Sequence, residues 1–531
     1  MSFRNRLALP AIILSLAFLA GCGSSSNKAV APPGGAFSDS SLTGTYVFST
    51  TGLDVNFSPL MIMGAFTAKG DGTLGGGAFT LADGANGVFS NQAINGGSYN
   101  VTQDGRGQVH LPNSISGLGT ITLDFALAST SHGVISEFDG NGSGSGSLDL
   151  QGTVSQSGIN SQSYAFSVAG DGSSGLLAVV GAFTLDANGA VATGVEDITS
   201  DNLQGASAIA SSVTGVSLNT SSTIAVGAGT APGIAAIDSG SLGLAFDVYA
   251  IDNTHLKVIE TDGIALASGD IFLQQSTLPS GTLAFTMVGL DPTYFPLAIG
   301  GVLPVSSGAI SGGLEDYNDG GVFNTANAVS GGFTALSGGR SLLTLTGIEN
   351  GASNQVLGTY TFAAYPSTGG ILMLEVDNAG ITTGTALAQT NTSFASSQGY
   401  AAGLTATNIT NLNGFFEEDD IAEFTATGSG FSGLIDVNDT GTLNFDKTFA
   451  GTYASVSSGR YSLTTTSNFG FNGAFYTVDG STVLFLETDT NQVGVGVFGT
   501  QSTPTAGAAI AHFAMARPRI AANHVSKSHS K

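Results

Sequence analysis

Short segments in which apolar and polar residues alternate recur along the chain, and turns rich in Gly, Asn and Asp separate them. Alternation of this kind is typical of strands with one buried face. In the first part of the chain it predicts eight strands, at 45–49, 61–68, 77–81, 98–102, 108–111, 120–126, 134–138 and 147–150. Since no segment keeps a capped helical period, the sequence predicts an all-β fold.

Consecutive predicted strands are joined by short turns such as Asp71-Gly72 and Asp139-Gly140. Short turns favour an antiparallel up-and-down meander, which closes into a small barrel or folds as a sandwich. Closure into a barrel would remove exposed strand edges, which are an aggregation hazard in strands with so few charges. We therefore expect eight-stranded antiparallel up-and-down barrels, similar to those of lipocalins, with a sandwich as the alternative.

A Glu-x-Asp motif followed by a Gln recurs four times, and the Gln always stands 14 residues after the Glu. The four copies are Glu137 and Asp139 with Gln151, Glu260 and Asp262 with Gln274, Glu375 and Asp377 with Gln389, and Glu487 and Asp489 with Gln501. A constant spacing in four copies predicts tandem repeats of domain size, about 110 residues each.

The repeats and the flanking segments divide the chain into seven parts. We expect a signal peptide at 1–21, a flexible tether at 22–41, β-repeats at 42–152, 162–276, 280–390 and 400–502, and a basic, disordered tail at 503–531. The fourth repeat lacks the Tyr-x-Phe opening of the first two and is the least typical, which suits a terminal unit.

The arginines between the tether and the tail are Arg106, Arg340 and Arg460, which occupy the same place in three repeats. Residues i and i+2 of a strand face the same side, so each Glu-x-Asp pair would present two carboxylates together. An Arg-to-carboxylate clamp across each barrel would explain both sets of residues. The second repeat lacks the Arg and has Ser222-Thr223 near that position, which counts against a universal clamp.

Two chemical roles compete with this structural role of the carboxylate pairs, namely glycoside hydrolysis and binding of a hard cation such as Ca²⁺. The segment 436–441 begins like an EF-hand loop, but Lys447 stands where the loop needs a bidentate Glu. The acidic run 417–420 is expected to be a solvated loop. We predict no catalytic residue, no metal site and no cofactor, because no nucleophile elbow, phosphate loop or His pair with metal spacing stands in the sequence.

The N-terminus has the three parts of an export signal, with Arg4 and Arg6 before an apolar run that ends in small residues. Leu19-Ala20-Gly21-Cys22 resembles the lipobox of bacterial lipoproteins, in which the Cys carries the lipid. Cys22 is the only Cys of the chain, and Gly23-Ser24-Ser25-Ser26 follows it. The resemblance implies lipidation of Cys22, palmitate included, and a place in the outer membrane, because Gly follows the Cys.

Composition narrows the function further. The chain has 78 Gly, 13 Lys+Arg and 38 Asp+Glu, for a formal net charge of -25. This charge argues against a nucleic-acid partner, and a single Cys cannot form an internal disulfide. The tail 503–531 is basic without acids, so it would suit an acidic envelope polymer or the protein's own acidic body.

The lipobox, the Gly-rich tether and the repeated motifs resemble the uncharacterised Gly-rich repeat lipoproteins of bacterial cell envelopes, a resemblance that implies no particular activity. We expect a non-enzymatic, outer-membrane-anchored lipoprotein of the cell envelope, periplasmic or surface-exposed, with a structural, adhesive or partner-binding role. Its partner would be an envelope polymer, a surface protein or a small apolar ligand. The alternatives are a small-ligand-binding barrel lipoprotein, a polysaccharide hydrolase and a membrane-spanning barrel.

Overall fold

The computed structural model describes residues 28–115, 117–173, 175–201, 210–278, 280–349, 357–378, 380–410 and 416–502. The predicted signal peptide, Cys22 and the tail 503–531 lie outside the described residues. Apart from the helix α1 (Gln156–Ile159) and the 3-10 turns η1 (Asp39–Ser41) and η2 (Ser337–Gly339), the elements are strands. The all-β prediction is therefore confirmed.

The strands form four sheets, one after another along the chain, and each sheet defines a domain. The first domain contains β1 (Thr43–Asp54), β2 (Pro59–Lys69), β3 (Leu74–Asp83), β4 (Gly87–Ile94), β5 (Ser98–Val101), β6 (Arg106–Leu111), β7 (Ile121–Leu127), β8 (His132–Glu137) and β9 (Gly142–Leu150). The second contains β10 (Ser163–Gly172), β11 (Gly175–Leu185), β12 (Val191–Asp201), β13 (Ala210–Ser217), β14 (Thr223–Ala225), β15 (Gly233–Asp238), β16 (Gly243–Ala250), β17 (His255–Glu260) and β18 (Ala265–Leu273).

The third and fourth domains have eight strands each. The third contains β19 (Gly281–Leu290), β20 (Pro296–Ser306), β21 (Ala309–Asp319), β22 (Val322–Ala335), β23 (Ser341–Glu349), β24 (Leu357–Ser367), β25 (Gly370–Glu375) and β26 (Ile381–Ala388). The fourth contains β27 (Gln398–Asn408), β28 (Phe416–Thr427), β29 (Gly430–Asp439), β30 (Thr442–Ser457), β31 (Arg460–Thr465), β32 (Gly473–Thr477), β33 (Thr482–Glu487) and β34 (Gln492–Thr500).

All four sheets are antiparallel meanders in which the first strand pairs with both the second and the last. The third and fourth are closed eight-stranded barrels. In the first two domains, two shorter strands stand where the third domain has the long β22. They are β4 and β5 in the first domain and β13 and β14 in the second, and they form the two edges of a nine-stranded sheet. A bridge between Thr73 and Ser98 still links the β3 side of the first domain to β5. The predicted barrel is confirmed, closed in two domains and partly open in two.

Strand alternation gives each domain two apolar faces. On β1, Tyr46 and Phe48 point into the core of the first domain, together with Phe66 and Phe125. Val47, between them, points outward and packs in a cluster with Tyr249 of the second domain. Because both faces are covered, inner strands such as β2 and β9 are buried along nearly their whole length.

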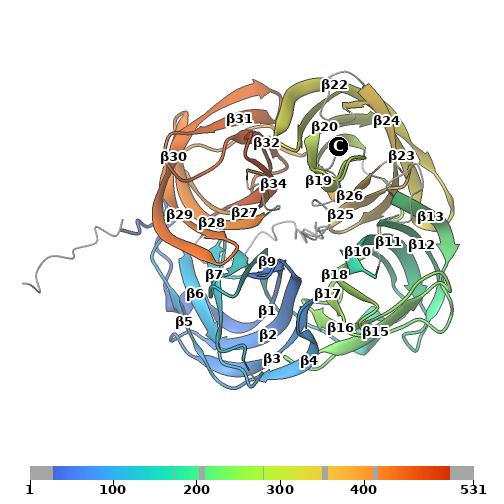
Figure 1. The fold of residues 1–531 in the computed structure, drawn as a ribbon, viewed down its shortest axis with the longest axis horizontal. Helices are drawn as coiled ribbons and strands as arrows, with labels where there is room; N and C mark the ends of the chain where they lie inside the picture. Colours follow the sequence, from blue (N-terminus) through green and yellow to red (C-terminus); the bar gives the residue numbers. More distant parts are fainter. Residues whose placement is uncertain are drawn as a thin grey trace, which may run out of the picture.

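The four domains follow one another around a ring, and the fourth returns to contact the first (Figure 1). One buried apolar cluster spans each junction, and the cluster between the fourth and first domains contains Ala401 and Ile421 with Ala126, Ala128 and Val134. At every junction, the face near the first strands of one domain packs on the face near the last strands of the next. Such a head-to-tail contact generates a closed ring when its rotation closes.

The acidic run 417–420 is not the solvated loop that the sequence predicted. It belongs to β28, and Glu417, Asp419 and Asp420 are buried. The expectation is wrong because another domain supplies the cover: Ser143 of the first domain donates its hydroxyl hydrogen to Asp419. Among the residues that the structure describes, no helix is long and apolar enough to cross a membrane.

Candidate functional site

The Asp of each Glu-x-Asp motif binds the backbone of a neighbouring strand, or the residue just before that strand, in its own domain. Its carboxylate accepts a backbone N–H in every repeat, and the donor stands at the corresponding place each time. The pairs are Thr122 to Asp139 at 3.3 Å, Ala245 to Asp262 at 2.8 Å, Thr361 to Asp377 at 2.9 Å and Asn472 to Asp489 at 2.7 Å. Four matching bonds assign these aspartates a structural role.

The Glu of each motif ends a strand and is enclosed. Glu137 is 2% exposed, and Glu260, Glu375 and Glu487 are fully buried. Burial and the adjacent Asp139 raise the pKa of Glu137 well above its usual range, and burial with Asp262 raises the pKa of Glu260 to about 8. Side chains enclosed to this degree offer no cleft for a polysaccharide, so the geometry gives the hydrolase alternative no support.

The Gln of each motif reaches into the next domain of the ring. Its side-chain N–H donates to a backbone carbonyl there in all four repeats. The bonds are Gln151 to Ala250 at 2.8 Å, Gln274 to Gly338 at 3.2 Å, Gln389 to Thr477 at 2.7 Å, and Gln501 to Asp104 at 2.7 Å and to Leu127 at 3.1 Å. The constant spacing found in the sequence therefore ends in an inter-domain hydrogen bond.

The three repeated arginines also join domains, and the predicted clamp to the Glu-x-Asp carboxylates is wrong. Arg340 donates from Nε and Nη2 to Asp197 of the second domain, at 2.7 and 2.6 Å. Arg460 binds Asp316 of the third domain through the same two atoms. Each Arg thus pairs with an Asp of the preceding domain, which the sequence of a single repeat could not show.

Arg106 makes the corresponding contact across the junction that closes the ring. Its guanidinium binds Asp436 and Asp446 of the fourth domain and Asp104 of its own domain. The side chain is 6% exposed. Asp124 is buried beside this group, and burial together with Asp436 raises its pKa well above the usual range. Several carboxyls therefore share one guanidinium at the closing junction.

Asp197, Asp316 and Asp436, which bind these arginines, also accept hydrogen bonds from other groups, and we call each of them a hub Asp. Asp316 is an example. It accepts the backbone N–H of Ala326 at 2.8 Å and the hydroxyl of Tyr476 at 2.6 Å, in addition to Arg460. Asp197 accepts Gly215 N–H at 2.8 Å and the hydroxyl of Tyr365 in the same way. Sequence analysis missed these tyrosines, although a Tyr one hairpin before the repeated Glu recurs in three repeats.

The junction between the first and second domains is built without an Arg. Thr80 takes the place of the hub Asp, because its hydroxyl accepts the N–H of Asn91 as Asp316 accepts that of Ala326. The same hydroxyl donates to Asp247 of the second domain and lies 3.0 Å from the Tyr249 hydroxyl. Ser90 donates to Asp247 as well, at 2.6 Å.

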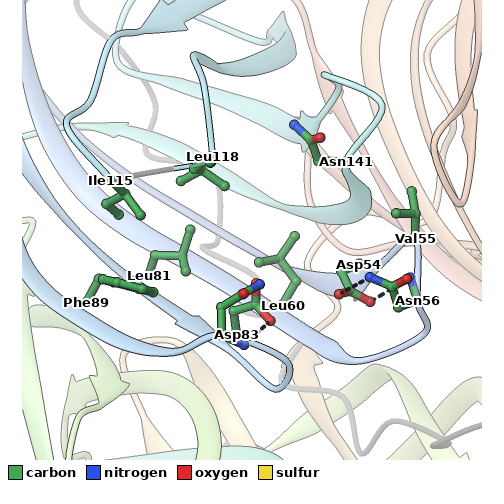
Figure 2. Close-up of a pocket in the computed structure, with 12 residues that line it drawn as sticks. Asp54, Val55, Asn56, Leu60, Leu81, Asp83, Phe89, Ile115, Leu118 and Asn141 are labelled. Atoms are coloured by element: carbon green, nitrogen blue, oxygen red, sulfur yellow. Dashed lines mark hydrogen bonds between the residues drawn. The ribbon is translucent and has the colours of Figure 1, made fainter.

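A pocket of about 230 Å³ opens at the mouth of the first domain (Figure 2). Its apolar floor continues the core of that barrel. Leu60 and Leu81 are core residues, and Phe89, Ile115 and Leu118 pack against them from the open side. Its rim holds Asp54, Asn56, Asp83, Asn86 and Asn141.

The rim side chains are arranged by their own turns. The Asp54 carboxylate accepts the backbone N–H groups of Asn56 and Ser58, at 2.8 and 2.7 Å. The Asp83 carboxylate accepts those of Ala85 and Asn86, at 2.7 and 3.1 Å. Each carboxylate thereby fixes a tight turn between strands and stays at the pocket edge.

The corresponding opening of the fourth domain is filled by the chain itself. The loop between β31 and β32 brings Phe469 and Phe471 against that barrel, and the rings of Phe449 and Phe471 lie 5.2 Å apart. In the first domain the described residues of the loop between β6 and β7 that pack against the core are Ile115 and Leu118. The smaller side chains leave the space that the pocket occupies.

No family model matches the chain, and no curated protein matches it. Among solved structures, the chain is similar to "The Structure of Intact Ap-TbpB (N and C lobes)", with 10% sequence identity over 71% of this chain and 86% of that one. The TM-score of this match is 0.17, which is too low to support an argument about fold or function.

Proposed function

We propose that this chain is a non-enzymatic lipoprotein, anchored in the outer membrane through Cys22, whose ring of barrels holds a partner at the cell envelope. The observation that carries the proposal is the use of the repeated polar residues. The arginines, hub aspartates and glutamines bind neighbouring domains, and the Glu of each Glu-x-Asp motif is buried within its own domain. The ring is thus a rigid support rather than four reaction sites.

The outer strands offer a surface for a partner. β22 and β30 lie at the periphery of the ring (Figure 1), and each has a single fully buried side chain. Their sequences are rich in Ser, Thr, Asn and Ala, and they expose Phe323, Phe445 and Val456 to solvent. Apolar side chains exposed on strands with few charges are suited to contact with another macromolecule.

The alternative of a small ligand inside every barrel has less support. Each barrel interior is occupied by a cluster of buried apolar side chains, such as Phe48, Phe66 and Phe125 in the first domain. A ligand of drug size needs a cavity of about 300 to 1,000 Å³. The pocket at the mouth of the first domain, at about 230 Å³, is smaller than this.

Lipidation is tested by labelling cells with palmitate. We expect the full chain to incorporate the label and Cys22→Ser to lose it and to leave the membrane fraction. Ser24→Ala is the matched control, since it changes a neighbouring tether residue and keeps the thiol. Equal labelling of the wild type and Cys22→Ser would refute the anchor.

Partner binding is tested with a photo-crosslinking amino acid at Phe323 or Val456, which are 41% and 51% exposed on the outer strands. We expect irradiation of intact cells to yield one discrete adduct from these positions. Val30, 71% exposed in the tether, is the control position and should not give the same adduct. If the outer strands yield no adduct of their own, the ring does not bind a partner through them.

A further inference from the structure

We propose that the pocket at the mouth of the first domain binds an organic ammonium ion, that is, a protonated amine on a small apolar body. This site is separate from the outer strands and does not depend on the partner proposed above. Three properties of the pocket carry the inference, namely its volume, its floor and the chemistry of its rim.

The volume suits a small aromatic or branched aliphatic group. An apolar cavity of about 150 Å³ holds benzene, and drug-sized ligands need about 300 Å³ or more. The pocket, at about 230 Å³, lies between these limits. It therefore has room for one ring with a short chain.

The floor provides the apolar contact. Leu60 and Leu81 are 6% and 1% exposed, and Phe89, Ile115 and Leu118 are half-buried around them. Transfer of an apolar body from water onto these side chains is favourable in proportion to the area covered. The floor explains why the ligand needs a hydrocarbon body, but it does not select its charge.

The rim selects the charge because its side chains present acceptors. The Nδ2 amides of Asn56, Asn86 and Asn141 donate to Asp54, Asp83 and Asp139, at 3.2, 2.7 and 2.8 Å. These bonds turn the amide donors toward the carboxylates and leave the amide oxygens as acceptors.

Two carboxylates complete the rim, and no Lys, Arg or His of the described part of the chain lines the pocket. Asp54 and Asp83 are 6% and 5% exposed, so a cation at this edge would be partly shielded from water. An ammonium group donates three hydrogen bonds and accepts none, which matches a rim of acceptors. An anion would meet carboxylates in a chain of net charge -25.

The fourth domain shows the same pairing of a cation with an apolar surface within the chain. There, the ammonium of Lys447 lies 5.3 Å from the centre of the Phe469 ring, beside the loop that fills the opening. In the first domain the loop leaves the space open, and among the residues that the structure describes no cation lines it. An external ammonium ion would supply what Lys447 supplies in the fourth domain.

The probe is phenethylammonium, titrated into the folded mature protein by calorimetry. Its comparators are 2-phenylethanol, which keeps the body and lacks the charge, and phenylacetate, which reverses the charge. We expect phenethylammonium to bind about tenfold more tightly than 2-phenylethanol. Phenylacetate should not bind.

Three variants locate the site. Asp54→Asn and Asp83→Asn keep an oxygen for the turn and remove the charge, so each should weaken phenethylammonium binding by about tenfold. Leu118→Trp should fill the floor and abolish binding. Asp186→Asn is the matched control, because Asp186 caps a turn of the second domain with the same type of bonds, at 2.7 and 2.9 Å.

Two results would overturn the proposal. Equal affinity for phenethylammonium and 2-phenylethanol, unchanged by Asp54→Asn and Asp83→Asn, would mean that the pocket binds apolar bodies without selecting charge. An absence of binding to the wild type would mean that no ammonium site exists. Circular dichroism of each variant distinguishes loss of the ligand from loss of the fold, and crosslinking at the outer strands is unaffected by either result.

Discussion

Removal of the Arg460 guanidinium tests whether buried ion pairs hold the ring together. The side chain is 3% exposed, and its Nε lies 2.7 Å from Oδ2 of the fully buried Asp316. Arg460→Met keeps an aliphatic side chain of similar length and deletes both bonds to the carboxylate. Asp316 would then keep the N–H of Ala326 and the hydroxyl of Tyr476.

The magnitude follows from the burial of the pair. An exposed ion pair contributes about 0.2 to 1 kcal/mol, whereas breaking a buried pair costs about 3 to 5 kcal/mol, because one charge is left without its partner. Since Asp316 keeps two donors, we expect the lower end, about 3 kcal/mol. Arg460→Met combined with Asp316→Asn removes both charges of the pair, so the double variant should cost at least about 2 kcal/mol less than the sum of the single variants.

The assay is native-state hydrogen exchange read by mass spectrometry on the full mature chain. Peptides that cover β21 and β32 report the free energy of opening on either side of the junction. Lys69→Met, at an exposed position at the end of β2, is the control and should change these values by less than about 0.5 kcal/mol. A change below about 1 kcal/mol for Arg460→Met, or an additive cycle, would refute a stabilising role for the buried pair.

Three further predictions concern Glu423, Ala326 and Gln501. Burial, with Asp104 nearby, raises the pKa of Glu423 to about 8, although Arg106 lowers it. The folded state therefore keeps a proton that the unfolded state releases near pH 4. The free energy of unfolding, measured by urea titration, should fall from pH 5 to 9, and Glu423→Gln should flatten this fall. Ala326 has a φ of 59°, so Ala326→Gly should stabilise β22 by about 0.5 to 1 kcal/mol in thermal unfolding, and Ala326→Val should destabilise it. Gln501→Ala should lower the free energy of unfolding by about 1 to 3 kcal/mol, because it removes the donor to the buried carbonyls of Asp104 and Leu127. The rate of hydrogen exchange in β6 and β7 should rise, and an unchanged rate would contradict a role for Gln501 in closing the ring.

The fold could be predicted from the sequence because local patterns determine it. Alternation located eight of the nine strands of the first domain, and the missed strand, β4, is an outer strand that is buried only at Ile94. A strand with so little buried surface carries no regular apolar pattern. The sequence also did not predict that the first domain has β4 and β5 where the third domain has the single strand β22. This break depends on the turn at 95–97, where Gly96 and Gly97 have positive φ.

The residues of the framework were visible in the sequence, but their partners were not. The constant spacing singled out Glu137, Asp139 and Gln151, and the repeat register singled out Arg106. Their roles depend on which domain lies next in space, which no pattern within one repeat encodes. The buried run at 417–420 was misread for the same reason, since a neighbouring domain covers carboxyls that would be solvated in an isolated barrel. The pocket was missed because it depends on the size of loop side chains relative to the space beneath them.

The junction between the first and second domains, which has no Arg among its described residues, supports the order of the domains in the ring most directly. The absence of an Arg in the second repeat argued against a clamp common to all repeats. In the ring, that Arg would face the first domain, and the first domain has Thr80 where the hub Asp stands in the other three. The cation and its counter-charge are therefore missing from the same junction. A buried Asp without the Arg, or the reverse, would leave an uncompensated charge at a cost of several kcal/mol. Paired loss spares this junction a hub Asp without its Arg. The carboxyl that remains there, Asp247, is 6% exposed and takes hydrogen bonds from the hydroxyls of Thr80 and Ser90.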